Sequence, residues 1–230
     1  RQHHHLRQLC GRGRLMQAAY IYDAIRTPRG RARADGGLHA LRPHDLLKCL
    51  YRALEHRTGL DPALVGEVIL GCVTQHAEQA GNIAKTSTLY SGWPTSVGGL
   101  TVNRFCSSGI DAISIAALKI AAGQEQAVVA GGVEMMSRVP MLSDEAAAFV
   151  DPAFAARCQM LMMGSGADLI ATLEGWTRDD VDLVAISLAA RESLRADFGD
   201  ERTGVAHAGW AVIGGDLISF SACDTVERLA

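Results

Sequence analysis

The sequence predicts an α/β fold, in which helices pack on the faces of a sheet. Short apolar runs typical of strands alternate with longer segments of helical period between residues 20 and 133. Of the 230 residues, 48% are hydrophobic and 20% are charged, which fits a globular chain and excludes collagen, coiled coils and disulfide scaffolds. The richest apolar stretch, residues 112–123, is interrupted by Lys119, so no stretch reaches the roughly 18 residues of a membrane span.

Strands and helices alternate in a regular order. The predicted strands cover residues 20–25, 65–73, 100–106 and 126–133. The predicted helices cover residues 45–59, 82–92 and 107–123. Gly59 and Gly92 stand where two of these helices should end. In the third helix one apolar side is predicted from Ile110, Ile113, Ala117 and Ile120. This helix is apolar on more than one face, so we expect it to be enclosed by other elements.

The chain divides into four parts. Residues 1–15 are basic and acid-free, and we interpret them as a non-native extension before Met16; an organelle-targeting segment is the alternative. Residues 16–137 form the α/β core, and residues 138–200 form an inserted loop region with returning helices. In that region Thr177 is placed to cap a helix.

The last part, residues 201–230, is an atypical tail in which the sequence pattern identifies no helix or strand. It is Gly-rich and aperiodic, as a frame disruption would make it. We therefore expect its large apolar side chains to be poorly buried, namely Trp210, Ile213, Leu217, Ile218 and Phe220.

Net charge and cysteine content limit the kinds of binding partner and the cellular compartments that we expect for this chain. The net charge is -3 although four arginines lie in the first fifteen residues, so the body of the chain is acidic and nucleic-acid binding is not predicted. The six cysteines show no CxxC spacing, which predicts reduced thiols and a cytoplasmic protein. A mitochondrial or peroxisomal location is the alternative if residues 1–15 are a targeting segment. No GxGxxG follows a strand, so no dinucleotide site is predicted.

Cys106 is the candidate nucleophile. It falls where a predicted strand ends and a helix begins, beside the unpaired N–H groups and the positive end of the helix dipole. That environment favours the thiolate, which is the nucleophilic form. The small residues Ser107, Ser108 and Gly109 leave space beside the sulfur. The alternative from position alone is a buried structural cysteine.

Several segments resemble the thiolase family, which comprises acyl-CoA acetyltransferases and 3-ketoacyl-CoA thiolases. VNRFCSSG around Cys106 resembles the nucleophile motif of that family, and VVAGGVEMMSRVP resembles its glycine-rich strand end. The other matching segments follow in family order: YDAIRTPRGR, LGCVTQHAEQAGNIAK and GADLIATLEGWTRDDVD, the last closest to the acetyl-CoA C-acetyltransferase branch. The resemblance covers residues 16–198 and implies the N-terminal half of a thiolase. The fold that it implies is a mixed sheet with helices on both faces, plus an inserted loop region.

The resemblance also implies a reaction. Cys106 would form an acyl-enzyme and pass an acyl group between acetyl-CoA or 3-ketoacyl-CoA and CoA, with its own backbone N–H holding the oxyanion. Met163 resembles the methionine that lines the acyl pocket; gap-filling core side chains are the alternative for Met160, Met162 and Met163. The family uses coenzyme A as a substrate, with no metal and no other cofactor, and it forms homo-oligomers.

Other polar residues near the motif have two interpretations. Asn103 and Arg104 would either fix the nucleophile's backbone through side-chain hydrogen bonds or, as we favour, serve a subunit contact. Glu134 follows a strand end and is interpreted as structural support for the active-site floor rather than as a general base. His76 is interpreted as a surface imidazole, because the family has no catalytic histidine in that segment.

The sequence also departs from the family. A thiolase's second half supplies a GHP-type histidine, a CxG cysteine and an NEAF-type asparagine, and none of these motifs occurs in these 230 residues; Cys223 lies in SACDTVERLA. We therefore expect thiolase acyl transfer to be incomplete in this chain. The alternatives are a catalytically silent fragment or pseudoenzyme that acts only by protein contact, and a condensing enzyme of the ketoacyl synthase type, against which AGGVEMMSR argues.

Overall fold

The computed structural model describes residues 17–184, 186–187 and 210–214. The predicted extension at residues 1–15 lies outside the described residues, as do Leu217, Ile218, Phe220 and Cys223. The described residues form two compact units, one of residues 17–143 with 210–214 and one of residues 144–187. Among the described residues, no helix has both the length and the apolar character that crossing a membrane requires.

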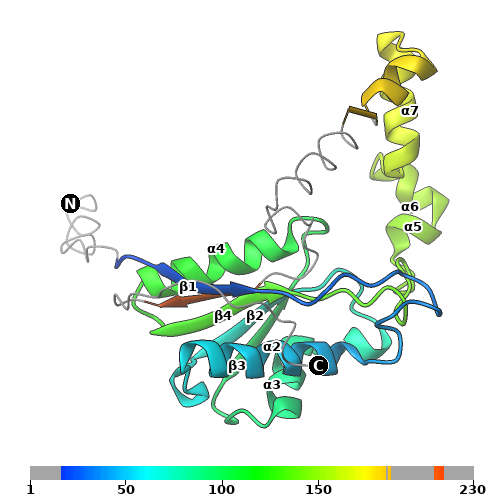
Figure 1. Ribbon diagram of the computed structural model, residues 1–230. Helices are drawn as coiled ribbons and strands as arrows, with labels where there is room; N and C mark the ends of the chain where they lie inside the picture. Colours follow the sequence, from blue (N-terminus) through cyan, green and yellow to red (C-terminus); the bar gives the residue numbers. More distant parts are fainter. Residues whose placement is uncertain (1–16, 185, 188–209, 215–230) are drawn as a thin grey trace, which may run out of the picture. The chain divides into compact units, whose positions relative to one another are not determined.

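The first unit is built on a five-stranded mixed sheet (Figure 1). Its strands are β1 Tyr20–Ile25, β2 Glu67–Gly71, β3 Gly98–Val102, β4 Ala127–Gly132 and β5 Trp210–Gly214. They lie in the order β1-β5-β4-β2-β3. β2 pairs in parallel with β3 and β4, whereas β5 runs antiparallel to both of its neighbours. The α/β class and the four strands predicted from the sequence are therefore confirmed.

The sequence pattern identified no element in the tail, yet residues 210–214 form β5 in the interior of the sheet. Ala211 lies opposite Ala24 of β1 on one side and Ala130 of β4 on the other. Five residues show too little periodicity to identify a strand, and the hydrogen bonds that stabilise β5 come from strands distant in sequence. The structure does not describe the side chains of Trp210 and Ile213, so the expectation that they are poorly buried stays a prediction.

Helices cover both faces of this sheet (Figure 1). α2 Pro43–Thr58 and α3 Ile83–Ser91 lie on one face, and α4 Ser108–Ala121 lies on the other. Two single-turn helices, η1 Pro62–Leu64 and η2 Ala77–Gln79, precede and follow β2. The predicted helix ends are confirmed, since Gly59 (φ 68°) and Gly92 (φ 83°) adopt the left-handed conformation that glycine tolerates.

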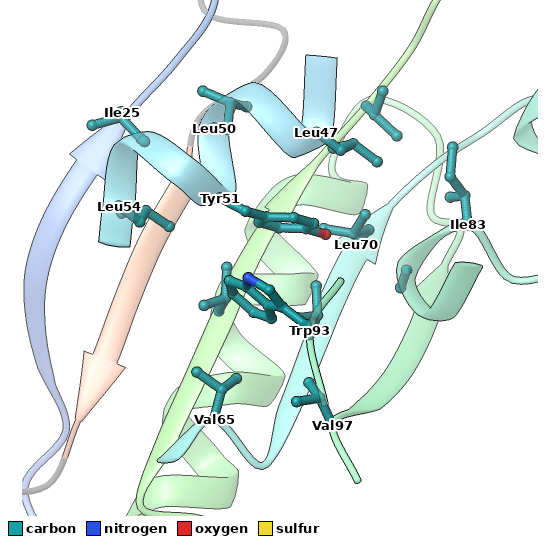
Figure 2. Close-up of a cluster of buried hydrophobic side chains, with 14 of the residues drawn as sticks. Ile25, Leu47, Leu50, Tyr51, Leu54, Val65, Leu70, Ile83, Trp93 and Val97 are labelled. Atoms are coloured by element: carbon teal, nitrogen blue, oxygen red, sulfur yellow. The ribbon is translucent and has the colours of Figure 1, made fainter. Parts of the chain in front are cut away.

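The larger core lies between α2, α3 and the sheet (Figure 2). Tyr51 is fully buried; its ring centroid lies 4.6 Å from that of Trp93, and its hydroxyl is 2.8 Å from Ser87 Oγ. Burying one leucine or isoleucine side chain contributes about 1.5–3 kcal/mol. The cluster includes the aliphatic side chains Ile25, Leu47, Leu50, Leu54, Val65, Leu70, Ile83 and Val97.

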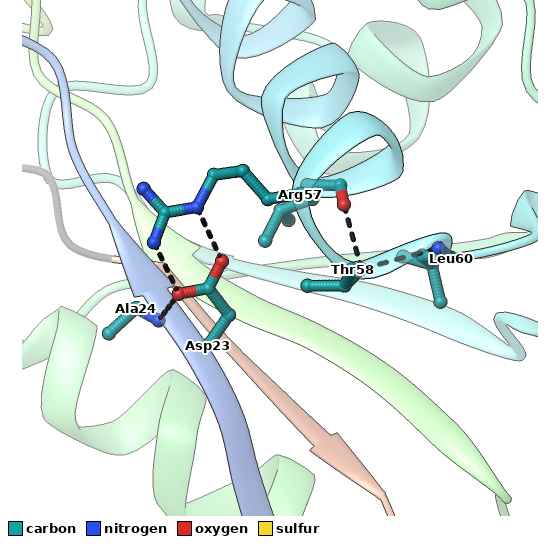
Figure 3. A network of polar contacts seen from close by, with 6 residues as sticks. Asp23, Ala24, Arg57, Thr58 and Leu60 are labelled. Carbon is teal, nitrogen blue, oxygen red and sulfur yellow. Dashed lines mark hydrogen bonds and ion pairs between the residues drawn. The ribbon is translucent and has the colours of Figure 1, made fainter. Parts of the chain in front are cut away.

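An ion pair joins α2 to the edge of the sheet (Figure 3). Arg57, near the end of α2, donates from Nε to Asp23 Oδ2 (2.9 Å) and from Nη2 to Asp23 Oδ1 (3.1 Å). Asp23 Oδ1 also accepts the backbone N–H of Ala24 at 2.8 Å. The carboxylate on β1 therefore receives a two-pronged contact, which fixes the direction in which the helix end crosses the strand.

The predicted apolar side of α4 is confirmed for Ile120, which is buried, and for Ile113 and Ala117, which pack against the same cluster, but not for Ile110. Ala112, Ala116 and Ile120 are fully buried against the sheet, whereas Ile110 is 68% exposed. The small alanine side chains allow the helix backbone to lie close to the strands. The side of α4 that carries Ala112 and Ala116 is therefore buried, although these are not its largest apolar residues. Ile110 and Leu118 are exposed apolar residues on the remaining surface, as expected for a helix that is apolar on more than one face.

The second unit is helical. It contains α5 Ala147–Val150, α6 Pro152–Arg157 and α7 Met163–Glu174, followed by helical residues 178–184. The predicted cap is confirmed: the Asp180 N–H donates to Thr177 Oγ1 (3.3 Å), and the Thr177 N–H donates to Asp180 Oδ2 (2.8 Å). This reciprocal pair is a capping box.

Candidate active site

Cys106 lies in a tight turn between β3 and α4, and it is exposed. β3 ends at Val102, four residues before the predicted end, because the chain leaves the sheet at Asn103. Phe105, directly before the cysteine, has φ 48° and so adopts the left-handed conformation. For a bulky residue this conformation costs about 1–3 kcal/mol, and strained residues of this kind cluster at functional sites. The turn therefore presents the thiol to solvent at an energetic cost.

Two serine hydroxyls hold this turn together. Ser108 Oγ donates to the carbonyl oxygen of Phe105 (2.6 Å) and accepts the backbone N–H of Arg104 (2.8 Å). Ser107 Oγ donates to the carbonyl oxygen of Arg104 (3.0 Å). Sequence reasoning treated the serines only as small residues; their position at a strand–helix junction was the signal for this role.

Arg104 points away from the turn towards the first turn of α4. Its Nε lies 2.6 Å from Asp111 Oδ2, and its side chain is 74% exposed. An exposed ion pair of this kind contributes little to stability, about 0–1 kcal/mol. Its effect at the site is to keep a positive charge beside the start of the helix that follows Cys106.

Gly71 allows α4 to begin where it does. A Cβ atom at this position, the last residue of β2, would lie 2.6 Å from the carbonyl carbon of Ser108 and 2.7 Å from the Gly109 nitrogen. Both are backbone atoms, which cannot move aside as a flexible side chain could. Glycine is thus needed for strand and helix to approach this closely, and this close approach determines where the turn with Cys106 lies.

Glu134 lies beneath the site and is half-buried, just after β4. Its Oε1 accepts the backbone N–H groups of Val73 and Thr74 (3.1 Å for Thr74), and its Oε2 accepts Gln79 Nε2 (3.1 Å). The partners that a buried carboxylate needs are therefore present. With both oxygens engaged by N–H donors, the arrangement supports the interpretation of Glu134 as a structural group.

Cys72 is a second thiol in the same neighbourhood, which sequence reasoning did not single out. Gln79 Nε2 donates to its sulfur at 3.5 Å. Burial, reinforced by the nearby Glu134 carboxylate, raises the pKa of the Cys72 thiol to about 12. The thiol therefore stays protonated at neutral pH and does not act as a nucleophile.

Asn103 makes two hydrogen bonds that relate to one of the two roles predicted for it. Its Oδ1 accepts the backbone N–H of Phe105 (2.9 Å), and its Nδ2 donates to the carbonyl oxygen of Val73 (3.2 Å). These bonds match the interpretation that this side chain fixes the nucleophile's backbone. The subunit contact that we favoured for Asn103 and Arg104 concerns other copies of the chain and stays a prediction.

The remaining predicted residues lie apart from the turn. Met163 begins α7 in the second unit and is 83% exposed, so the alternative of a gap-filling core side chain is wrong for it; its role in an acyl pocket stays a prediction. His76 is exposed, as expected of a surface imidazole. In the described part of the chain, no three His, Cys, Asp or Glu side chains are grouped so that they could hold a metal ion.

An exposed cysteine on a strained strand–helix turn, next to a mixed α/β sheet, is the arrangement expected of a nucleophile that forms covalent intermediates. The model of the family described as "Thiolase, N-terminal domain" matches residues 19–201. The chain therefore belongs to the thiolase family.

Individual relatives agree with this assignment. The chain is 38% identical over 193 residues to a steroid 3-ketoacyl-CoA thiolase of Mycobacterium tuberculosis, covering 79% of this chain and 46% of that protein. It is 38% identical over 188 residues to a 3-oxoadipyl-CoA/3-oxo-5,6-dehydrosuberyl-CoA thiolase of Escherichia coli, covering 74% and 46%. The chain thus spans about half the length of the curated relatives it matches.

A solved structure shows the same fold. The acetyl-CoA acetyltransferase of Bacillus anthracis superimposes with a TM-score of 0.66 at 26% sequence identity. The match covers 88% of this chain and 66% of that one. The predicted architecture, the N-terminal half of a thiolase with a mixed sheet, helices on both faces and an inserted loop region, is confirmed.

Proposed function

We propose that this chain carries the nucleophile of a thiolase-type acyl transfer and that Cys106 is the residue acylated. The observation that carries the proposal is the exposed Cys106 thiol, which follows a residue held at φ 48°. A strained backbone that presents a nucleophile to solvent is more readily explained by chemistry than by folding. The relatives' names support acyl-CoA thioesters as the substrate class and CoA as the second substrate.

The proposed half-reaction balances on acetyl-CoA. The Cys106 thiolate attacks the thioester carbonyl carbon, a new carbon–sulfur bond forms, and the bond from that carbon to the CoA sulfur breaks. CoA leaves as a thiolate and takes up a proton, equivalent to the one that Cys106 lost. Acetyl-CoA is therefore the substrate of this half-reaction and free CoA its product, CoA is a substrate when the acyl group is passed back to it, and the step as written uses no metal and no other cofactor.

The test is stoichiometric acetylation of the 230-residue chain by acetyl-CoA, followed by peptide mapping. A single transfer is measured rather than turnover, because the histidine that activates the nucleophile in the family lies in a GHP motif that this sequence lacks. We expect one acetyl group, on Cys106. Acetyl groups on Cys49 or Cys158 at an equal or higher rate, or no acetylation at all, would favour a silent protein that acts by contact.

We also propose that the chain assembles with copies of itself. β3 ends the strand order, and among the described strands it pairs only with β2, so its other edge has no strand partner there, although the Gly99 carbonyl oxygen accepts Asn82 Nδ2 (2.9 Å). A second copy could add to that edge. Light scattering across a concentration series tests this proposal, and a monomer at every concentration would contradict it.

We also propose a cytoplasmic compartment, on the basis of the thiols. Cys49, Cys72, Cys106 and Cys158 are all free, which supports the proposal of a reducing, cytoplasmic environment. The mitochondrial or peroxisomal alternative depends on residues 1–15. Fluorescence microscopy of the chain with and without residues 1–15 distinguishes the two locations.

A further inference from the structure

The left-handed Phe105 needs support from outside its own side chain. Its carbonyl oxygen accepts the Ser108 hydroxyl, so one side of this residue is tied to the start of α4. Its N–H is tied in the opposite direction, to Asn103 Oδ1 at 2.9 Å. This second bond closes an Asx turn, in which a side-chain oxygen bonds the backbone N–H two residues ahead.

Asn103 is itself anchored to the neighbouring strand end. Its Nδ2 donates to the Val73 carbonyl oxygen at 3.2 Å, across the gap between the residues that follow β2 and those that follow β3. An aspartate could accept the Phe105 N–H equally well but could not donate to Val73. Only the amide side chain, with one acceptor and one donor group, makes both contacts.

The Val73 peptide group is fixed as well. Its N–H donates to Glu134 Oε1, while its carbonyl oxygen accepts from Asn103. Glu134 is in turn held by Gln79, whose Oε1 accepts the Met135 N–H at 2.5 Å. A continuous set of hydrogen bonds therefore runs from the segment after β4, through the end of β2, to the residue that precedes Cys106.

From this geometry we infer that Asn103 is a positioning residue, which holds the Phe105 turn and thereby directs the Cys106 thiol. The inference rests on the proposed function, since it assigns a role at the same nucleophile. Asn103 does not touch the thiol in this arrangement; it acts through the backbone of Phe105. Loss of the side chain would free Phe105 to return to an ordinary negative φ, and Cys106 would move with it.

The test is a double-mutant cycle read by the rate at which iodoacetamide alkylates Cys106 in the full chain. Asn103→Ala is made in the natural background and in a Phe105→Gly background, because glycine adopts a positive φ without penalty. We expect Asn103→Ala to slow alkylation about tenfold beside Phe105 and less than about twofold beside the glycine. An unchanged rate, or the same loss in both backgrounds, would overturn the inference.

A conservative variant separates the two bonds. Asn103→Asp keeps an acceptor for the Phe105 N–H and loses the donor to Val73, so we expect a rate between those of the natural chain and Asn103→Ala. A rate at or below that of Asn103→Ala would contradict the role of the Asx turn. Exposed Cys49 and Cys158 are reference thiols in the same digest, and their rates should not change.

Folding is monitored in the same experiment. Cys72 is buried, so it stays unlabelled in a folded chain. If Asn103→Ala exposes Cys72, Asn103→Leu, which keeps the branching at Cγ and has neither polar group, replaces it in the cycle with the same expected outcomes. Because alkylation involves no acyl-CoA, a failed acetylation counts against the proposed function, whereas a failed cycle counts against the role of Asn103.

Discussion

Two cysteines follow neighbouring parallel strands at the same edge of the sheet, and their surroundings are opposite. Cys72 comes directly after β2, and its backbone N–H still donates to the Val102 carbonyl oxygen of β3 (3.0 Å), so it remains within the hydrogen-bond ladder. Cys106 comes four residues after the end of β3, beyond a left-handed turn. One sulfur is therefore enclosed by the sheet, and the other lies outside it.

This difference determines the chemistry of each thiol. Cys72 is 1% exposed, and its pKa is raised to about 12, chiefly by burial and further by Glu134. Cys106 is exposed beside the start of α4. The point at which a strand leaves its sheet, rather than the presence of a cysteine at a strand end, therefore sets how exposed each thiol is, and we expect only the exposed thiol to react.

The largest expected effect comes from removing each thiol in turn. Cys106→Ala should abolish acetylation by acetyl-CoA, because Cys106 is an exposed thiol beside a left-handed residue at the start of a helix, whereas Cys158, beside the left-handed Gln159 (φ 53°), lies at the end of α6. Cys72→Ala should retain acetylation, since the Cys72 thiol is buried and protonated. Intact-mass measurement of both variants checks this prediction, and loss of the adduct in the Cys72 variant alone would reverse our assignment.

The next effect comes from the close approach of β2 and α4. Gly71→Ala would place a Cβ atom 2.6 Å from the Ser108 backbone, so we expect a destabilisation of about 1–3 kcal/mol and slower alkylation of Cys106. Gly37→Ala is the matched control, because a Cβ atom there meets nothing within 4 Å. Denaturant unfolding of the two variants measures the difference, and equal stabilities would show that the close approach is not tight.

A smaller effect concerns the carboxylate beside Cys72. Glu134→Gln removes the negative charge that helps to raise the pKa of the Cys72 thiol, so this pKa should fall. It should still stay above the ordinary value of a cysteine, because burial is the larger cause. The 13C chemical shift of the Cys72 Cβ atom, followed by NMR as a function of pH in the folded chain, reports the change. Glu174→Gln, an exposed substitution in the second unit, is the control and should leave the profile as it was.

The smallest expected effect is a pH dependence of stability that arises at His44. His44 Nε2 lies 3.0 Å from Thr86 Oγ1, and burial lowers the pKa of this imidazole below 6.5. Below pH 6.5 the unfolded chain therefore binds more protons at this residue than the folded chain, so stability falls as the pH decreases through that range.

His44→Gln should flatten this part of the pH dependence. Tm measured between pH 7 and pH 5 tests the prediction, with the exposed His56→Gln in the same helix as the control. If the His44 variant keeps the full slope, the pH dependence of stability comes from other groups.

Local signals in the sequence predicted most of the first unit. Glycines at 59 and 92 mark real helix ends, and the alternation of apolar runs located β1, β2 and β4. Contacts between distant segments were not predictable in this way. β5 depends on partners about 80 and 190 residues away in sequence, and no local pattern carries that information.

The candidate site, like the fold, was predictable only where a local motif carries the information. The motif identified Cys106, but the buried side of α4 and the end of β3 depend on the close approach at Gly71, which appears only once strand and helix are placed together. The hydrogen bonds of Asn103 cross between two strand ends, and the burial of Cys72 depends on its surroundings in three dimensions. Both are properties of the tertiary structure.

The most direct test of our account is the relative rate at which iodoacetamide labels Cys106, Cys49, Cys158 and Cys72 in the native chain at neutral pH. The strained turn before α4 predicts that Cys106 reacts first, that Cys49 and Cys158 follow, and that Cys72 stays unlabelled until the chain unfolds. Faster labelling of Cys49 or Cys158, or a Cys106 as slow as Cys72, would contradict the claim that this turn presents the nucleophile.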